Sequence, residues 1–251
     1  MSCTLAEIYR HPVKSLGEEA LDAVALTAGR PVPWDRVWAV AHGGAEWQGG
    51  RWAPPATFVN QTHVPRLAQI GVAFDEAAGR LTLRHPDLPE LAVTPGTTDG
   101  DAALTDWIAP LVEGTPRQGP FTVAWAESVQ FTDFEETHVS IGSLSSRRAL
   151  EEIAGQPLEP IRFRMNLWLE GLSPWEDLDL VGRDIEVGPA RLRVIRRDAR
   201  CNATTASPAT GERDVPVVAL LKKTFGHTDF GIYAQVVRGG TVRRGDAARI
   251  L

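Results

Sequence analysis

The sequence predicts a mostly β fold with peripheral helices (α+β), in which a β-rich domain over residues 1–115 precedes a β-barrel domain over residues 116–251. Short apolar or alternating runs recur along the chain, as is typical of β-strands. Turn residues separate them, with 23 glycines and 18 prolines among 251 residues. Helical spacing of apolar residues is confined to a few segments. A Gly- and Pro-containing stretch at 113–119 gives the expected domain boundary.

The N-terminal half reads as strands with one helix. Strands are expected at 5–10, 23–27, 36–41, 81–84 and 91–94. The last two form a pair joined by a His-Pro-Asp turn. Pro12 ends the first strand, so Lys14 and Ser15 fall in a loop. Residues 101–112 have helical spacing, and Pro110 should bend or end this helix early.

The C-terminal half adds more strands and two helices. Strands are expected at 121–125, 163–169, 184–187, 191–195, 231–237, 241–244 and 248–251, and helices at 144–153 and 215–225. Gly155 and Gly226 end the two helices. The strands at 231–237 and 241–244 are expected to form a hairpin. This number of short strands around few helices indicates a barrel with helices outside.

Composition and charge exclude several classes of protein. The net charge of −6 gives no positive field for nucleic acid or an anionic membrane. No apolar run reaches the ~20 residues of a membrane span, and the N-terminus lacks a signal peptide. We therefore expect a cytoplasmic protein with no nucleic-acid or membrane partner. Cys3 and Cys201 are too few for a disulfide framework or a four-cysteine metal site.

The segment before Cys201 has an unusual charge. Five arginines lie between residues 191 and 200, against the single acid Asp198. Nearby positive charge favours a thiolate, which is a ligand for soft metal centres. The alternative is an inert, buried cysteine. Asp198 could tune the site, relay a proton or form an ordinary ion pair.

A second polar segment is Arg162-Phe-Arg-Met-Asn166. On one strand, Arg162, Arg164 and Asn166 would share a face, where they could bind a phosphate or carboxylate. The alternative is a solvated strand face. Lys14 and Ser15 add a cation and a hydroxyl, although Lys14 alone could be an ordinary surface lysine.

Five motifs in order resemble MOSC-domain proteins, named after the C-terminal domain of molybdenum cofactor sulfurase. The motifs are His11-Pro-Val-Lys-Ser15, Trp34-Asp-Arg-Val-Trp38, Arg162-Phe-Arg-Met-Asn166, Arg200-Cys-Asn-Ala-Thr-Thr205 with Pro208-Ala-Thr-Gly211, and the glycine-rich stretch 231–246. The most similar branch carries an N-terminal MOSC-associated β-barrel domain and includes the mitochondrial amidoxime-reducing component and its bacterial relatives. The resemblance covers about residues 4–251. Met165 departs from it, because proline is expected there.

The resemblance implies a molybdopterin-type molybdenum cofactor. Cys201 would be the metal ligand and catalytic residue. Lys14, Ser15 and Arg36 would hold the pterin phosphate. The other implied cofactor contacts are Arg164, Asn166, Arg200, Thr204 and Thr205.

The implied activity is that of a molybdenum-dependent oxidoreductase. It would reduce N-hydroxylated compounds, such as amidoximes, by two-electron oxygen-atom transfer, and a separate protein would donate the electrons. One alternative is a carrier of sulfur or molybdenum cofactor, using a Cys201 persulfide or thiolate. The other is a cofactor-free domain that binds a different anion, since fold alone does not fix function.

Overall fold

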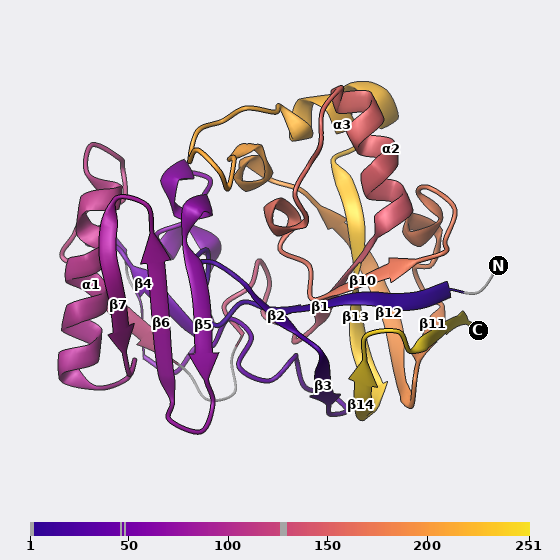
Figure 1. Ribbon diagram of the computed structural model, residues 1–251, viewed down its shortest axis with the longest axis horizontal. Helices are drawn as coiled ribbons and strands as arrows, with labels where there is room; N and C mark the ends of the chain where they lie inside the picture. The colour runs from indigo at the N-terminus through magenta and orange to yellow at the C-terminus, as the bar shows by residue number, and fades with distance from the viewer. Residues whose placement is uncertain (1–2, 46, 48, 126–129) are drawn as a thin grey trace.

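The computed structural model describes residues 3–45, 47, 49–125 and 130–251 (Figure 1). The strands are β1 (Cys3–Arg10), β2 (Glu19–Leu21), β3 (Ala23–Leu26), β4 (Trp38–Ala41), β5 (Gly71–Asp75), β6 (Arg80–His85), β7 (Leu88–Val93), β8 (Thr122–Trp125), β9 (Val139–Ser143), β10 (Leu167–Glu170), β11 (Asp184–Val187), β12 (Ala190–Ala199), β13 (Asp229–Arg238), β14 (Gly240–Arg243) and β15 (Ala247–Ile250). The α-helices are α1 (Thr98–Val112), α2 (Leu144–Ala154) and α3 (Val217–Phe225). Single 3₁₀ turns include η3 (Pro160–Phe163) and η5 (Asn202–Thr205).

Seven strands close a barrel in the order β10-β9-β13-β12-β11-β15-β1, and β1 pairs back onto β10. All neighbours are antiparallel except β9 and β10, which run parallel. Alternate residues of the long strands β12 and β13 point inward, among them Leu192, Val194, Ile232 and Ala234. The helices α2 and α3 lie outside the barrel (Figure 1). The predicted mostly β fold with a barrel and peripheral helices is therefore confirmed.

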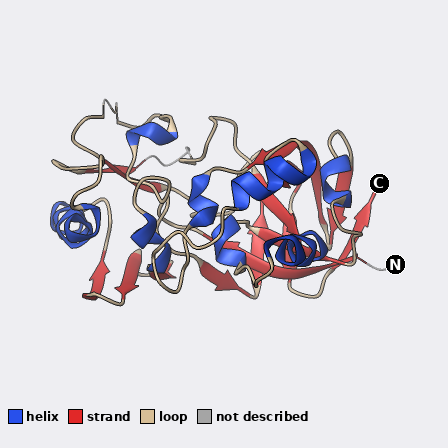
Figure 2. Ribbon diagram, turned by 90° about the horizontal axis from the view of Figure 1, so that it is seen from above, coloured by secondary structure: helices blue, strands red, loops and turns tan. Residues whose placement is uncertain are grey.

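The N-terminal lobe is formed by two smaller sheets and one helix. β5, β6 and β7 form an antiparallel sheet, and β4 pairs with β8. Figure 2 shows α1 at the end of the molecule opposite the barrel and both chain termini. Trp38, Leu67, Leu81 and Ile108 belong to the core of this lobe. The first strand, β1, belongs to the barrel although it lies in the range 1–115 that we assigned to the N-terminal domain.

Most predicted helix ends are found in the structure. Ser143 caps α2 by accepting a hydrogen bond from the Ser146 amide, and Gly155 ends it in the left-handed conformation at φ 72°. Gly226 ends α3 in the same way. Pro110 does not end α1 early, because it lies in the last turn and the helix continues to Val112. No helix in the described part of the chain is long and apolar enough to span a lipid bilayer.

Two expectations about strands are wrong. The strand expected over 163–169 begins only at Leu167, because Pro160 starts the turn η3 and Arg164 is left-handed at φ 51°. Arg162, Arg164 and Asn166 therefore do not share a strand face. The expected hairpin is also absent from the described sheets, because β14 pairs with β3 rather than with β13.

Candidate functional site

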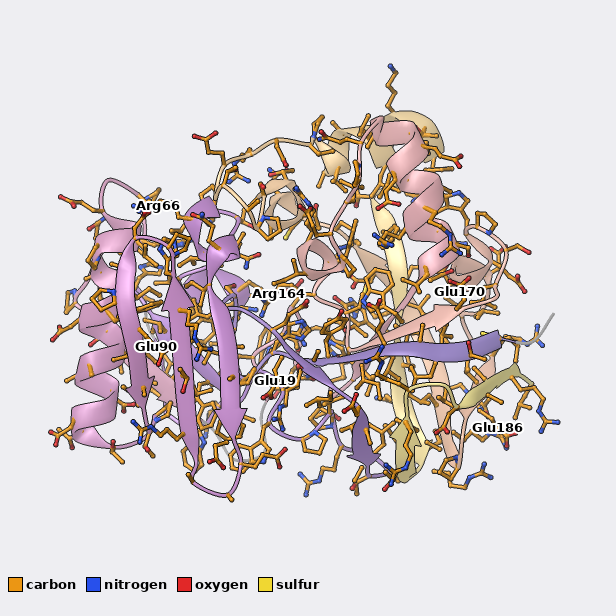
Figure 3. The ribbon with its side chains drawn as sticks, in the orientation of Figure 1. Glu19, Arg66, Glu90, Arg164, Glu170 and Glu186 are labelled. Carbon is orange, nitrogen blue, oxygen red and sulfur yellow. The ribbon has the colours of Figure 1, made fainter. Side chains whose placement is uncertain are left out.

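A cavity of about 300 Å³ opens between the barrel and the N-terminal lobe. We call it the central cavity. Its lining includes Lys14, Ser15, Arg36, Asn60, Thr62, His63, Arg117, Asp133, His138, Ser140, Arg164, Asp198, Arg200, Cys201, Ala203 and Tyr233. Arg164, which Figure 3 labels, lies where the two parts of the molecule meet. Residues far apart in the sequence thus converge on one pocket of the size that small ligands occupy.

Six of the nine predicted site residues line the central cavity: Lys14, Ser15, Arg36, Arg164, Arg200 and Cys201. The other three are buried beside it. Asn166 donates to Asp35 at 2.9 Å and accepts from the Ser140 amide at 3.1 Å. The hydroxyls of Thr204 and Thr205 bond back to the carbonyls of Cys201 and Asn202, at 3.0 and 2.7 Å. These three residues hold the walls of the cavity in place.

Three lining residues have a left-handed backbone that side chains other than glycine rarely adopt. The φ angles are 65° at Ser15, 54° at Arg36 and 51° at Arg164. Arg36 is fixed there by a 2.6 Å hydrogen bond from its amide to the His11 carbonyl. Such conformations cost energy and persist where the surrounding structure enforces them, often at functional sites.

The central cavity is positively charged although the protein is net negative. Five cations line it, Lys14, Arg36, Arg117, Arg164 and Arg200, against the carboxylates Asp133 and Asp198. Burial lowers the pKa of Arg164 to about 9, and Arg36 nearby contributes to the shift. Burial also lowers the pKa of Lys14. The lining therefore carries more positive than negative charge, which favours an anionic ligand.

Asp35 is the buried hub beneath these cations, and its side chain is 0% exposed. It accepts from the His11 amide and Asn166 Nδ2, both at 2.9 Å, and from Gln130 Nε2 at 2.7 Å. It also forms an ion pair with Arg36. Burial alone would raise the pKa of Asp35, but the Arg36 charge and the bonds from His11 hold it well below its usual value. Asp35 is therefore ionised and joins four segments of the chain.

Cys201 lies at the exposed edge of the cavity. Its carbonyl accepts from the Thr204 amide at 3.2 Å, so the backbone is fixed at the start of η5. Its Sγ accepts a hydrogen bond from the Thr62 hydroxyl at 3.4 Å. The residue is exposed, so the alternative of a buried cysteine is wrong.

Arg162 does not reach the cavity, and its interpretation as an anion ligand is wrong. The guanidinium is 2% exposed and bonds both carboxylate oxygens of Asp214, at 2.7 and 2.6 Å. It also donates to the Ala206 carbonyl at 3.2 Å. Arg162 thus anchors the loop that follows Cys201.

Sequence reasoning gave no site role to the lining residues Arg117, Asp133 and Tyr233, because they come from separate segments. Among the scattered histidines, which look ordinary in the sequence, His138 is a candidate that does line the cavity. The ring of His138 stacks on Phe134 with centroids 4.2 Å apart and meets the ring of Tyr233 at 4.3 Å. The guanidinium carbon of Arg196 lies over the ring of Phe134, 3.9 Å from the ring centroid. Asp198, for which tuning of the site, proton relay and an ion pair are the three alternatives, pairs with Arg200, and burial raises the pKa of Asp198 to about 6.

The chain matches two families in tandem. Residues 2–113 match the MOSC N-terminal beta barrel domain. Residues 124–249, half of the chain, match the MOSC domain. The chain belongs to the MOSC-domain family. The resemblance drawn from the five motifs is thereby confirmed, and both halves of this MOSC protein are accounted for.

Three solved structures are similar to this MOSC protein. The YuaD protein from Bacillus subtilis is 15% identical with a TM-score of 0.47, over 100% of this chain and 96% of that one. YiiM from Geobacillus stearothermophilus is 21% identical with a TM-score of 0.36, over 45% and 53%. A hypothetical protein is 12% identical with a TM-score of 0.41, over 100% and 67%. No curated protein matches the chain. The assignment therefore rests on the two family matches.

His138 should make the stability of this MOSC protein depend on pH. Burial lowers its pKa to about 4 from an ordinary 6.5, so the folded state keeps the ring neutral where the unfolded state is protonated. The contribution of His138 to the free energy of unfolding should fall by about 3 kcal/mol as the pH drops from about 6.5 to 4. Asp198, with its raised pKa, works in the opposite direction over this range.

Urea unfolding of the wild type and His138→Gln across this pH range isolates the histidine. The stability difference between the two proteins should shrink on acidification as the wild type loses its advantage. A difference that stays constant with pH would contradict a neutral, buried His138.

Proposed function

We propose that this MOSC protein binds a molybdopterin-type molybdenum cofactor in the central cavity and reduces N-hydroxylated compounds, such as amidoximes. The observation that carries the proposal is the thiol of Cys201 on the wall of a cavity with an excess of cations. The MOSC family is associated with this cofactor. A site for a simple anion would need the cations but not the thiol.

The residues present fit the chemistry of the cofactor. Its phosphate requires cations and hydrogen-bond donors, which Lys14, Ser15, Arg36 and Arg164 would supply. Arg200 lies next to the thiol, and its buried Nε has no partner among the described residues. A thiolate is the soft ligand that a molybdenum centre would take from the protein. In the described part of the chain, no group of three His, Cys, Asp or Glu side chains could hold a metal ion.

The cofactor, when bound, would supply the redox centre for two-electron oxygen-atom transfer. The chain would supply binding, orientation and protons. Reduction of an N-hydroxyl group to an amine and water consumes two electrons and two protons. Asp198 is placed to take up and release a proton at the cavity wall at mildly acidic pH, because burial raises its pKa to about 6. The electrons would come from a separate donor protein.

The test begins with composition. The protein is expressed in cells that make molybdenum cofactor and in matched cells that cannot. Molybdenum is measured by mass spectrometry and oxidised pterin by fluorescence. We expect near-stoichiometric molybdenum and pterin only from the first cells. With a reduced viologen dye as electron source, the loaded protein should then convert benzamidoxime to benzamidine. Loaded protein that turns over no N-hydroxy or N-oxide compound would refute the reductase proposal.

A carrier role is the second candidate, and the exposure of Cys201 favours it. An exposed thiol can take a sulfane sulfur atom from a persulfide donor, which is left as a thiol, and then pass that atom to an acceptor. The carrier proposal predicts substoichiometric cofactor and sulfane sulfur bound to Cys201, which cyanide would release as thiocyanate. Stoichiometric, firmly held cofactor without sulfane sulfur would exclude it.

A further inference from the structure

Arg117 lines the central cavity from the segment between α1 and β8. It stands beside two histidines of the N-terminal lobe. Its Nη1 lies 3.1 Å from Nε2 of His42, and its Nη2 lies 3.4 Å from Nδ1 of His63. We call these three residues the Arg117 cluster. The hydrogen bonds that the two histidines form with other groups determine whether His42 Nε2 or His63 Nδ1 can accept from the guanidinium.

The ring of His42 cannot accept from Arg117. Its Nδ1 accepts a hydrogen bond from the Gly44 amide at 3.2 Å, so the ring proton lies on Nε2. That Nε2–H donates to the Ala56 carbonyl at 3.0 Å. The nitrogen that faces Arg117 is therefore itself a donor.

The ring of His63 is fixed in the same sense by Asn60. The Asn60 Nδ2 donates to the carbonyls of Phe58 and Pro55, at 2.9 and 3.2 Å, which sets the orientation of the amide. Its Oδ1 then faces His63 Nδ1 at 3.0 Å and accepts from it. The nitrogen nearest to Arg117 again carries a proton, whether the ring is neutral or charged.

Arg117 thus presents its guanidinium to two other donors. Among the described residues, the buried Nε of Arg117 has no hydrogen-bond partner. No carboxylate in the described part of the chain forms an ion pair with the Arg117 guanidinium. A donor left without an acceptor in a partly buried place is costly. An oxyanion in the cavity would provide the missing acceptors, and a guanidinium binds carboxylates and phosphates through two parallel hydrogen bonds.

We propose that the Arg117 cluster binds a carboxylate or phosphate group of the substrate. This inference rests on the proposed function, because the rest of the substrate would react in the same cavity. The phosphate of the cofactor shares this chemistry. The position favours the substrate, because the cations assigned to the cofactor phosphate, Lys14, Arg36 and Arg164, are buried or half-buried, whereas His63 of the cluster is exposed. The protein would then prefer N-hydroxylated compounds that carry an anionic group.

The test compares a neutral probe with an anionic one that is otherwise matched. Benzamidoxime and its 4-carboxylate are each titrated calorimetrically into the molybdenum-loaded protein without reductant, and kcat/KM is then measured with reductant. We expect the carboxylate to bind about tenfold more tightly or better. Arg117→Gln should remove this preference, so that the two probes bind with similar affinity. Arg66→Gln is the matched control, because it removes one arginine outside the cavity and should change nothing.

The outcomes separate this proposal from the proposed function. Equal affinity of the wild type for both probes, with turnover of both, would overturn the anion site and leave the reductase intact. Tighter binding of the carboxylate that depends on Arg117, without turnover, would support the anion site and refute the reductase. Loss of pterin and molybdenum from Arg117→Gln would overturn the substrate assignment and give Arg117 to the cofactor phosphate. Should Arg117→Gln fail to fold, Arg117→Lys keeps the charge and loses the two-bond geometry, so it should reduce the preference severalfold.

Discussion

Replacing Asp35 with asparagine is expected to lower the free energy of unfolding by about 3–5 kcal/mol, the usual cost of removing one partner from a buried ion pair. Asp35 is 0% exposed and accepts hydrogen bonds from His11, Gln130 and Asn166 while pairing with Arg36. Asparagine has the same shape, but an NH₂ group replaces one of the two carboxylate oxygens. This NH₂ group would face hydrogen-bond donors instead of accepting from them. The Arg36 charge would also lose its compensating carboxylate. The wall of the central cavity would therefore loosen together with the fold.

Urea unfolding of cofactor-free protein measures the effect without a contribution from ligand binding. Asp22→Asn is the matched control, because the Asp22 side chain is 99% exposed and its ion pair with Arg244 is on the surface. That variant should stay within about 0.5 kcal/mol of the wild type. A similarly small change for Asp35→Asn would show that the hub is not needed for the fold.

The fold could be predicted where local chemistry decides it. Strands such as β6 and β13, and helices with a glycine stop, such as α2, were predicted close to their observed bounds. The strand β9 was missed because all five of its residues are buried, so no alternation marks it. The pairing of β14 with β3 joins residues more than 200 positions apart. Local turn chemistry carries no information about such a contact.

The site shows the same limit. The motif positions Lys14, Arg36, Arg164 and Cys201 do meet in one cavity, as the resemblance to MOSC proteins implied. Arg162 shares a motif with Arg164, yet the turn begun by Pro160 directs it to Asp214 instead. The two histidines beside Arg117 are fixed by a hydrogen bond from the Gly44 amide and by hydrogen bonds to Ala56 and Asn60, which only the folded chain brings together. The sequence motifs therefore indicate the part of the cavity lined by Lys14, Arg36 and Arg164 better than the part lined by the Arg117 cluster.

Replacing Cys201 with alanine is expected to reduce bound molybdenum to background and to abolish reductase activity, while the protein stays folded. The side chain is exposed, and its one hydrogen bond among the described residues is from the Thr62 hydroxyl. The backbone of Cys201 is held through its carbonyl, which alanine retains. The free energy of unfolding should therefore change by less than about 0.5 kcal/mol.

The same variant separates the two ways in which the cavity would hold the cofactor. The cations around Lys14 and Arg36 are untouched, so pterin should remain at a reduced but measurable level when molybdenum is lost. Cys201→Ser tests the sulfur itself, because a hydroxyl is a harder and weaker ligand for such a metal, and it should behave like alanine. Cys3→Ala is the matched control, since Cys3 is the other cysteine and is buried in β1. It should keep its molybdenum. Full molybdenum content in Cys201→Ala would mean that the thiol is not the metal ligand, and the cations of the cavity would then have to hold the cofactor by its phosphate and pterin alone.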